Sequence, residues 1–147
     1  MNDRKVKDIF IKDAITAEFI ADSIRKHSAK KDIGAHSIFL GQVRADSIDN
    51  RKVAAIEYSS YREMALLKMQ GIREAIFDKY PLTCMHVWHS LGRVNAGDIC
   101  LFVFTSSAHR KAAIDACEEM VERIKRELPI WGKEIFDDNT HQWKQNN

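Results

Sequence analysis

Basic side chains with a spacing suited to anion binding lie in the C-terminal third of this sequence. His109 and Arg110 follow a Thr-Ser-Ser-Ala run where a helix is expected to begin, and Lys125 lies further along the same predicted helix. The unpaired N–H groups and the positive dipole end of a helix N-terminus favour a bound phosphate or carboxylate. The pattern therefore predicts a local anion site near the start of this helix.

Helical geometry predicts where these side chains point. At about 100° per residue, one apolar stripe forms, and His109 and Arg110 fall within about 60° of its centre, so they are expected to lean toward the protein. Lys125 lies about 90° from that centre, at the margin of the stripe. The stripe contains Ala113, Cys117, Met120, Val121, Ile124 and Leu128. The alternative is an ordinary capped helix whose arginine pairs with a carboxylate and whose lysine reaches into solvent.

Other kinds of site are disfavoured by spacing and charge. His86 and His89 are three residues apart on a predicted strand, which puts them on opposite faces, and no third ligand has a suitable spacing, so no metal site is expected. The three tryptophans are far apart and lack interleaved basic residues, which favours packing over base stacking. With 23 Lys and Arg against 21 Asp and Glu, the net charge of +2 argues against nucleic-acid binding.

Composition points to a cytoplasmic protein. The longest apolar run, Ile99 to Phe104, is far shorter than the roughly 20 residues that cross a bilayer, and no secretory signal is visible, so no membrane association is expected. Cys84, Cys100 and Cys117 are odd in number and widely spaced, which argues against both a disulfide framework and a metal knuckle.

Strand-like and helix-like segments alternate without a linker rich in Pro or Gly, which predicts a single domain over residues 1–147 with a C-terminal tail from about residue 135. Helices are expected after Thr16, after a capping box formed by Ser60 and Glu63, and after Ser107. Pro81 and Pro129 end the last two. Strands are expected at residues 6–11, 34–43, 53–58, 83–90 and 99–104, with a polar, mobile loop at 44–52 and a hairpin turn at 94–98.

Five motifs in order resemble the large subunit of molybdopterin synthase. They are Gly41-Gln42-Val43-Arg44; Glu57-Tyr58-Ser59-Ser60-Tyr61 with Met64-Ala65; His89-Ser90-Leu91-Gly92 with Gly97-Asp98; Ser106-Ser107-Ala108-His109-Arg110; and Lys125 through Pro129-Ile130-Trp131-Gly132-Lys133-Glu134. Each motif is weak alone. Together they extend the resemblance from about Gly34 to Trp143, about three-quarters of the chain.

The resemblance implies an α+β fold of the α/β hammerhead type, in which helices pack on an antiparallel or mixed sheet. It implies a sulfurtransferase that converts cyclic pyranopterin monophosphate to molybdopterin. The sulfur would come from the C-terminal thiocarboxylate of a small ubiquitin-like subunit ending in Gly-Gly. The large subunit would form a homodimer within a heterotetramer, and it would carry no metal or cofactor of its own.

The resemblance also assigns roles to residues. Lys125 and Lys133 would be catalytic, and the substrate-binding set would be Gln42, Val43, Arg44, His109, Arg110, Lys125, Gly132, Lys133 and Glu134. Two positions depart from the family pattern. Gly132 stands where the family commonly has an important lysine, so Lys133 is expected to substitute for it, and Ser90 stands where the family commonly has an arginine.

The anion-site pattern leaves two other classes of function open. One is a non-catalytic module that binds a phosphate ligand or a ubiquitin-like partner through the helix that begins near His109. The other is an acyl-transfer enzyme that uses a nucleotide-bearing cofactor. A basic pocket beside a narrow groove for a Gly-Gly tail would favour the sulfurtransferase over both.

The length of the last predicted helix gives one further expectation. Arg110 and Lys125 are fifteen residues apart, so at 1.5 Å per residue their Cα atoms lie roughly 22 Å apart. One small pterin can hardly touch both. The active site is therefore expected to be shared between two copies of the chain.

Overall fold

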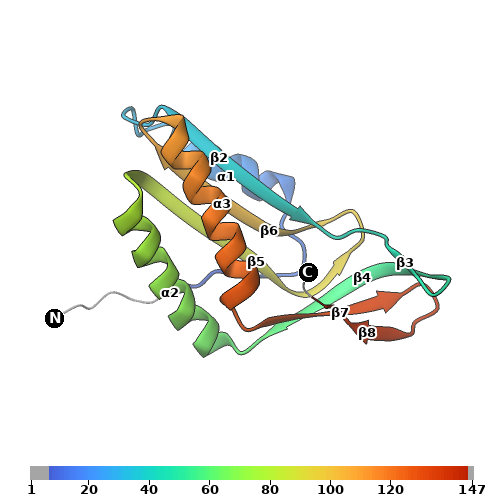
Figure 1. The fold of residues 1–147 in the computed structure, drawn as a ribbon. Coiled ribbons are helices and arrows are strands. Elements are labelled where there is room, and N and C mark those ends of the chain that lie inside the picture. Colours follow the sequence, from blue (N-terminus) through green and yellow to red (C-terminus); the bar gives the residue numbers. More distant parts are fainter. Residues whose placement is uncertain (1–6, 146–147) are drawn as a thin grey trace.

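A computed structural model describes residues 7–145 of the chain as one sheet with three helices (Figure 1). The helices are α1 (Ala17–His27), α2 (Arg62–Lys79) and α3 (Arg110–Glu127). The strands are β1 (Phe10–Lys12), β2 (Ala35–Gln42), β3 (Ser47–Ile48), β4 (Arg51–Ser60), β5 (Leu82–Asn95), β6 (Ile99–Ser107), β7 (Ile130–Phe136) and β8 (His141–Trp143). The predicted α+β class is confirmed.

The sheet is mixed and has the order β2-β6-β5-β4-β7-β8. Strand β1 pairs with β5 in parallel, and the other pairings between the described strands are antiparallel. The long strand β5 changes partner along its length. Its residues 82–89 pair with β6, whereas its residues 92–95 pair with β4. This change of partner joins the β4-β7-β8 part of the sheet to the β2-β6 part.

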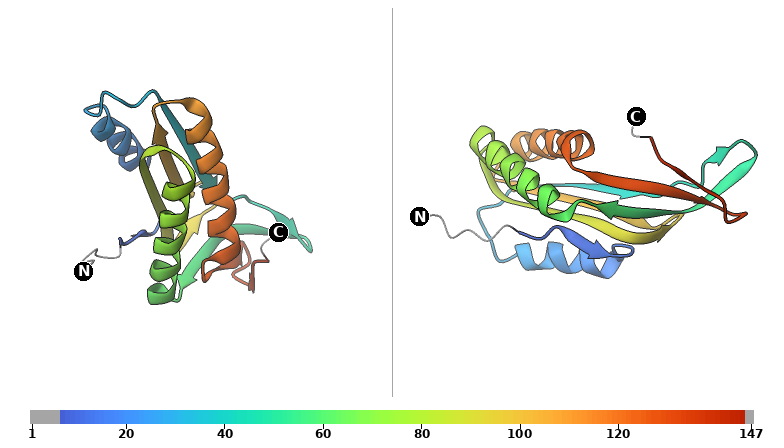
Figure 2. Two further views of the ribbon diagram at one scale, coloured as in Figure 1. Left: turned by 60° about the vertical axis from the view of Figure 1, so that its left-hand side comes forward. Right: turned by 90° about the horizontal axis from the view of Figure 1, so that it is seen from below.

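Helices cover both faces of the sheet. Figure 2 shows α2 and α3 side by side on one face and α1 on the other. The main core lies under α2 and α3, where every member of the predicted α3 stripe is buried. A smaller cluster around Phe102 and Phe104 lies under α1, where the ring of Phe19 meets that of Trp88 edge-on at 5.3 Å.

The three helix starts differ in how well local sequence signals predicted them. Thr16 caps α1 as expected, because its hydroxyl accepts the Phe19 N–H at 3.1 Å. The predicted capping box at Ser60 and Glu63 is wrong. Tyr61 is the N-cap of α2, and the Ser60 hydroxyl instead donates to the Pro129 carbonyl at 2.9 Å. A contact with Pro129, the residue directly before β7, therefore replaces the local cap.

Two segments in which no strand was predicted do contain strands. The expected mobile loop at 44–52 includes a tight hairpin between β3 and β4, in which Asp49 and Asn50 both have positive φ, as a two-residue turn of type I′ requires. The expected tail from residue 135 instead contains the end of β7 and then β8, which pairs back on β7. Strand β5 also extends to Asn95, beyond the predicted end at residue 90. Val6, predicted as the start of the first strand, lies outside the described residues.

None of the helices between residues 7 and 145 combines the length and apolar character that crossing a membrane demands.

Candidate active site

A small pocket lies where the end of α3 meets β7. It has a volume of about 30 Å³ and includes Lys125 from α3 and Gly132 from β7. Its remaining lining residues are Tyr58, His89, Ile124, Leu128, Ile130 and Lys144. The Lys125 side chain is exposed while its helical neighbour Ile124 is buried, which matches the marginal position predicted from the helix. The pocket therefore joins an accessible amine to buried polar groups.

His89 is held in the neutral form at the floor of this pocket. Burial lowers its pKa to about 4, and the nearby positive charge of Lys125 acts in the same direction. His89 is 4% exposed, and its Nδ1 lies 2.7 Å from the Ser90 carbonyl oxygen. A carbonyl can only accept, so Nδ1 carries the hydrogen and Nε2 keeps its lone pair.

Tyr58 provides a hydroxyl that stays protonated. Burial raises the pKa of Tyr58 above its ordinary value, and Cys100 and then Glu134 add to the increase. The Tyr58 ring packs edge-on against the His89 imidazole, with centroids 5.1 Å apart. The pocket thus has a neutral hydrogen-bond donor, a neutral imidazole and a cationic amine within one small space.

Gly132 makes room for the Tyr58 ring. Tyr58 and Gly132 are direct partners in the β4–β7 ladder. A Cβ atom at position 132 would lie 2.9 Å from Ile56 Cγ2 and 3.3 Å from Tyr58 Cε1, both closer than side chains normally pack. A lysine at this position would need Ile56 or Tyr58 to move. The glycine that departs from the family pattern therefore stands where a side chain would clash.

Lys133 lies outside the pocket around Lys125. Successive side chains of a strand point to opposite faces, so Lys133 points away from the face that Gly132 presents. Its ammonium lies 3.7 Å from the Glu57 carboxylate and 6.0 Å from the centre of the Trp143 ring. Lys144 is the second lysine that lines the pocket, and its backbone N–H donates to the Gly132 carbonyl at 2.8 Å.

His109 and Arg110 lie at the opposite end of α3 from the pocket. Helix α3 begins at Arg110, and His109 is its N-cap with no side-chain cap bond, so the expected cap from the preceding serines is not formed. The His109 N–H instead donates a long hydrogen bond to the Ser107 hydroxyl oxygen, at 3.4 Å. Both basic side chains are exposed, whereas the helical wheel predicted that they lean toward the protein. The start of α3 sits beside the start of β2, where the Gly34 N–H donates to Ser107.

The remaining predicted substrate-binding residues occupy two further places. Gln42 ends β2, and Val43 follows it as a buried residue paired with the Gly97–Asp98 turn. Arg44 is exposed, with its guanidinium 3.3 Å from the Asp46 carboxylate. Glu134 is buried on β7 and accepts a hydrogen bond from the Gln142 amide at 3.4 Å.

The structure thus brings together only part of the set predicted from sequence. Lys125 and Gly132 share a pocket, whereas the pair His109 and Arg110 lies at the far end of the helix. Sequence reasoning did not select Tyr58, His89 or Lys144 for this site. Tyr58 and His89 stood within two of the family-like motifs, which was an available signal, but Lys144 carried none because it reaches the pocket through the pairing of β8 with β7.

Comparisons with known proteins agree on one family. A family model described as MoaE protein matches residues 13–127. The molybdopterin synthase catalytic subunit of Pyrococcus abyssi is 35% identical over 105 residues, which cover 71% of this chain and 70% of that protein. The rat protein of the same name is 35% identical over 113 residues, which cover 77% of this chain and 56% of that protein.

Solved structures give the same result. The crystal structure of molybdopterin synthase from Staphylococcus aureus matches with a TM-score of 0.81 and 32% identity, covering 97% of this chain and 98% of that one. A Helicobacter pylori structure, described as a complex of subunits 1 and 2 of molybdopterin-converting factor, matches with a TM-score of 0.79. That match covers 94% of this chain and 90% of the other, and its 21% identity bears on the fold alone.

Proposed function

The chain belongs to the MoaE family, whose curated relatives are molybdopterin synthase catalytic subunits, and we propose that it performs the sulfur transfer of that enzyme. The substrate is cyclic pyranopterin monophosphate. The sulfur donor is the C-terminal thiocarboxylate of a small ubiquitin-like subunit. Each transfer forms one carbon–sulfur bond on the pterin, where a carbon–oxygen bond breaks and the oxygen is the leaving group. The acyl–sulfur bond of the donor breaks in the same transfer, and its acyl carbon takes an oxygen from water to become a carboxylate.

The observation that carries this proposal is the pocket around Lys125. It is narrow, it has glycine in place of a side chain at position 132, and it holds two lysines beside a protonated tyrosine. A thiocarboxylate is a small anionic group, so the end of such a tail is the kind of ligand that this pocket accepts. Charge-assisted hydrogen bonds from lysine to an anion are about twice as strong as neutral ones.

Lys125 is the central catalytic residue in this proposal. Its ammonium stabilises the negative charge that develops as the acyl–sulfur bond changes, or its amine attacks the acyl carbon for a short time. The neutral Tyr58 hydroxyl is available to donate a hydrogen bond to the same oxygen or sulfur. Lys133 or Lys144 supplies the second cation, and Gly132 gives the Tyr58 ring the room that it needs beside Lys125.

In this proposal, a second set of residues binds the phosphate-bearing pterin. Gln42, Val43 and Arg44 contact it from the end of β2, and Lys133 borders it on β7. His109 and Arg110 complete the site from a second copy of the chain. Fixed positive charge and free helix N–H groups are suited to a phosphate.

The homodimer in this proposal is supported by the surface of β2. This strand is at the edge of the sheet, and no described strand pairs with its outer side. Three consecutive large apolar residues on it, Ile38, Phe39 and Leu40, are each at least 36% exposed. An exposed, apolar edge strand favours association with another chain.

The cellular setting in this proposal is the cytoplasm. All three cysteines are free and buried, in keeping with a reducing compartment.

Reconstitution tests the proposed reaction. The purified chain is mixed with a thiocarboxylated small subunit and the cyclic precursor, and molybdopterin is measured. We expect product from the natural chain and almost none from Lys125→Ala, which should fold normally because an exposed helical position tolerates alanine. Normal turnover by Lys125→Ala would overturn the assignment of Lys125. Precursor binding without any product from the natural chain would instead identify a non-catalytic binding module.

A further inference from the structure

A second cluster of reactive side chains lies outside the pocket around Lys125. His27 is the last residue of α1, while Cys84 and His86 are two residues apart on β5 and therefore share one face of that strand. One ligand atom from each residue lies within 4.8 Å of the other two. We infer that His27, Cys84 and His86 form a binding site for one divalent transition-metal ion of the Zn²⁺ type.

The two imidazoles are already close to the spacing that a shared ion requires. His27 Nε2 lies 3.0 Å from His86 Nε2. Zinc binds histidine nitrogen at about 2.0–2.1 Å with tetrahedral angles, which places two such nitrogens roughly 3.3 Å apart. To admit the ion, the His86 ring would carry its hydrogen on Nδ1 instead of Nε2, and the two rings would separate by only a few tenths of an ångström.

The tautomer of His27 is fixed in the form that binds metal. Its Nδ1 lies 2.7 Å from the backbone carbonyl oxygen of Ser23, which can only accept a hydrogen bond. Nδ1 therefore carries the hydrogen, and in the neutral ring the Nε2 lone pair points at His86. A ring N–H held by a backbone carbonyl is the usual outer-shell partner of a metal-binding histidine.

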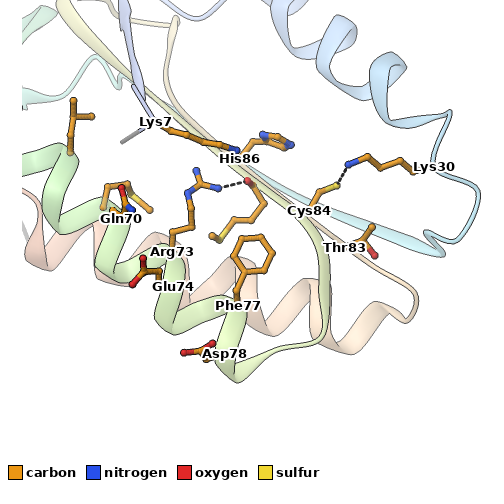
Figure 3. A pocket seen from close by; sticks show the side chains of 13 residues that line it. Lys7, Lys30, Gln70, Arg73, Glu74, Phe77, Asp78, Thr83, Cys84 and His86 are labelled. Carbon is orange, nitrogen blue, oxygen red and sulfur yellow. Dashed lines mark hydrogen bonds between the residues drawn. The ribbon is translucent and has the colours of Figure 1, made fainter. Parts of the chain in front are cut away.

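Cys84 supplies a sulfur ligand with a charged neighbour. The Lys30 ammonium donates a hydrogen bond to the Cys84 sulfur at 2.7 Å (Figure 3). The thiolate is the form of cysteine that binds metal. The thiolate also offsets part of the charge of an incoming cation. The positive charges of Lys7 and Arg73 oppose that cation, but the Arg73 guanidinium is turned to the Met85 carbonyl at 2.8 Å, and Glu74 and Asp78 line the same cavity.

An adjoining cavity leaves the fourth coordination position open. It has a volume of about 630 Å³ and lies against α2, with Cys84 and His86 in its wall, as Figure 3 shows. Three protein ligands with an open fourth position are typical of zinc sites that bind water or a solute, rather than of closed structural sites. The cluster is separate from the pocket around Lys125, because the two cavities share no lining residue.

Cobalt binding to the full chain tests this inference. The protein is stripped with a chelator and titrated with Co²⁺ and then Zn²⁺, following stoichiometry by calorimetry and the sulfur-to-cobalt charge-transfer absorption by spectroscopy. We expect one ion per chain, a charge-transfer band, and displacement of Co²⁺ by Zn²⁺. No saturable binding, or binding without the charge-transfer band, would overturn the inference.

Variants locate the ion. We expect Cys84→Ser to abolish the charge-transfer band and His86→Gln to weaken Co²⁺ binding roughly tenfold or more. The matched control is His141→Ala, an exposed histidine on β8 that should leave binding unchanged. Circular dichroism checks folding, and if Cys84→Ser fails to fold, the half-exposed His86→Gln decides alone. Unchanged affinity in folded His86→Gln, or loss of binding in His141→Ala, would refute the site. These readouts do not depend on molybdopterin formation, so they are independent of the proposed reaction.

Discussion

At the scale of single residues, the second lysine of the site is the sharpest question. The sequence points to Lys133, which follows the glycine at the position of the family lysine. The structure pairs Lys133 with Glu57 across the β4–β7 ladder and places Lys144 in the pocket with Lys125. A cation already close to a carboxylate offers less net charge to an anionic substrate than one that lines the pocket.

We therefore expect Lys144→Ala to slow molybdopterin formation at least tenfold, equivalent to about 1.4 kcal/mol in the barrier. Lys133→Ala serves as the matched control and should have the smaller effect. Single-turnover rates with the thiocarboxylated small subunit measure both. A larger loss in Lys133→Ala would restore the assignment made from sequence and show that β7 shifts when substrate binds.

His89 should make the stability of the protein depend on pH. Its pKa is about 4 in the folded chain, against about 6.5 in an unfolded one, because burial disfavours the imidazolium. Between these values the unfolded chain binds more protons, so acid favours unfolding. The stabilising contribution is present above pH 6.5 and is lost as the pH falls toward 4.

Urea unfolding at pH 7 and pH 4.5 measures this effect. We expect the contribution of His89 to the free energy of unfolding to fall by about 2–3 kcal/mol over that interval, because each unit of pKa difference corresponds to about 1.36 kcal/mol. His89→Gln cannot titrate there, so its free energy of unfolding should change less with pH than that of the natural chain, whatever its absolute stability. Equal pH slopes for the two proteins would show that His89 is not held neutral by burial.

At the scale of secondary-structure elements, the pairing of β4 with β7 sets the shape of the pocket. Tyr58 and Gly132 face each other in that ladder, and the missing side chain of the glycine is the space that the tyrosine ring uses. Side chains pack so closely at this point that adding a single methyl group should change the stability of the protein.

We expect Gly132→Ala to lower the free energy of unfolding by about 1–3 kcal/mol, because the added Cβ would meet Ile56 and Tyr58 at less than normal contact distance. Gly71→Ala is the control. Gly71 lies within α2, and apart from the adjacent backbone of that helix no atom lies within 4 Å of the added Cβ, so this change should stabilise the protein by up to about 1 kcal/mol. Denaturant unfolding compares them, and equal effects would show that Gly132 is not sterically required.

The elements also mark how far the sequence could predict the fold. The stripe of α3 and the cap at Thr16 were predicted, because both depend on residues within a few positions of one another. The capping box at Ser60 was wrong because its hydroxyl bonds to Pro129, 69 residues away. The change of partner along β5 and the return of β8 onto β7 also depend on distant pairings, which periodicity does not encode.

The same limit applies to the sites. Lys125 could be selected because its place on the helix and its family-like motif agreed. His27 and His86 are 59 residues apart, so their proximity could not be inferred from spacing. The third residue of that cluster, Cys84, is close to His86 in sequence, but two candidate ligands alone do not predict a metal site.

At the scale of the whole molecule, the length of α3 separates the two halves of the proposed site. The helix runs without interruption from Arg110 to Glu127, so Arg110 and Lys125 remain roughly 22 Å apart along its axis. Neither His109 nor Arg110 lines the pocket around Lys125. A twofold dimer would resolve this separation by bringing the helix start of one copy to the pocket of the other, which yields two equivalent sites.

A mixing experiment tests the shared site. Lys125→Ala and Arg110→Ala chains, each expected to be inactive alone, are combined under conditions that let dimers exchange, and exchange is verified by mass spectrometry of differently tagged copies. A mixed dimer then has one site that lacks both side chains and one that retains both. With random exchange, half of the dimers are mixed, so activity should recover to about a quarter of that of the natural chain. If mixed dimers form and activity stays absent, each pocket is built within a single chain, and His109 and Arg110 act at some other surface.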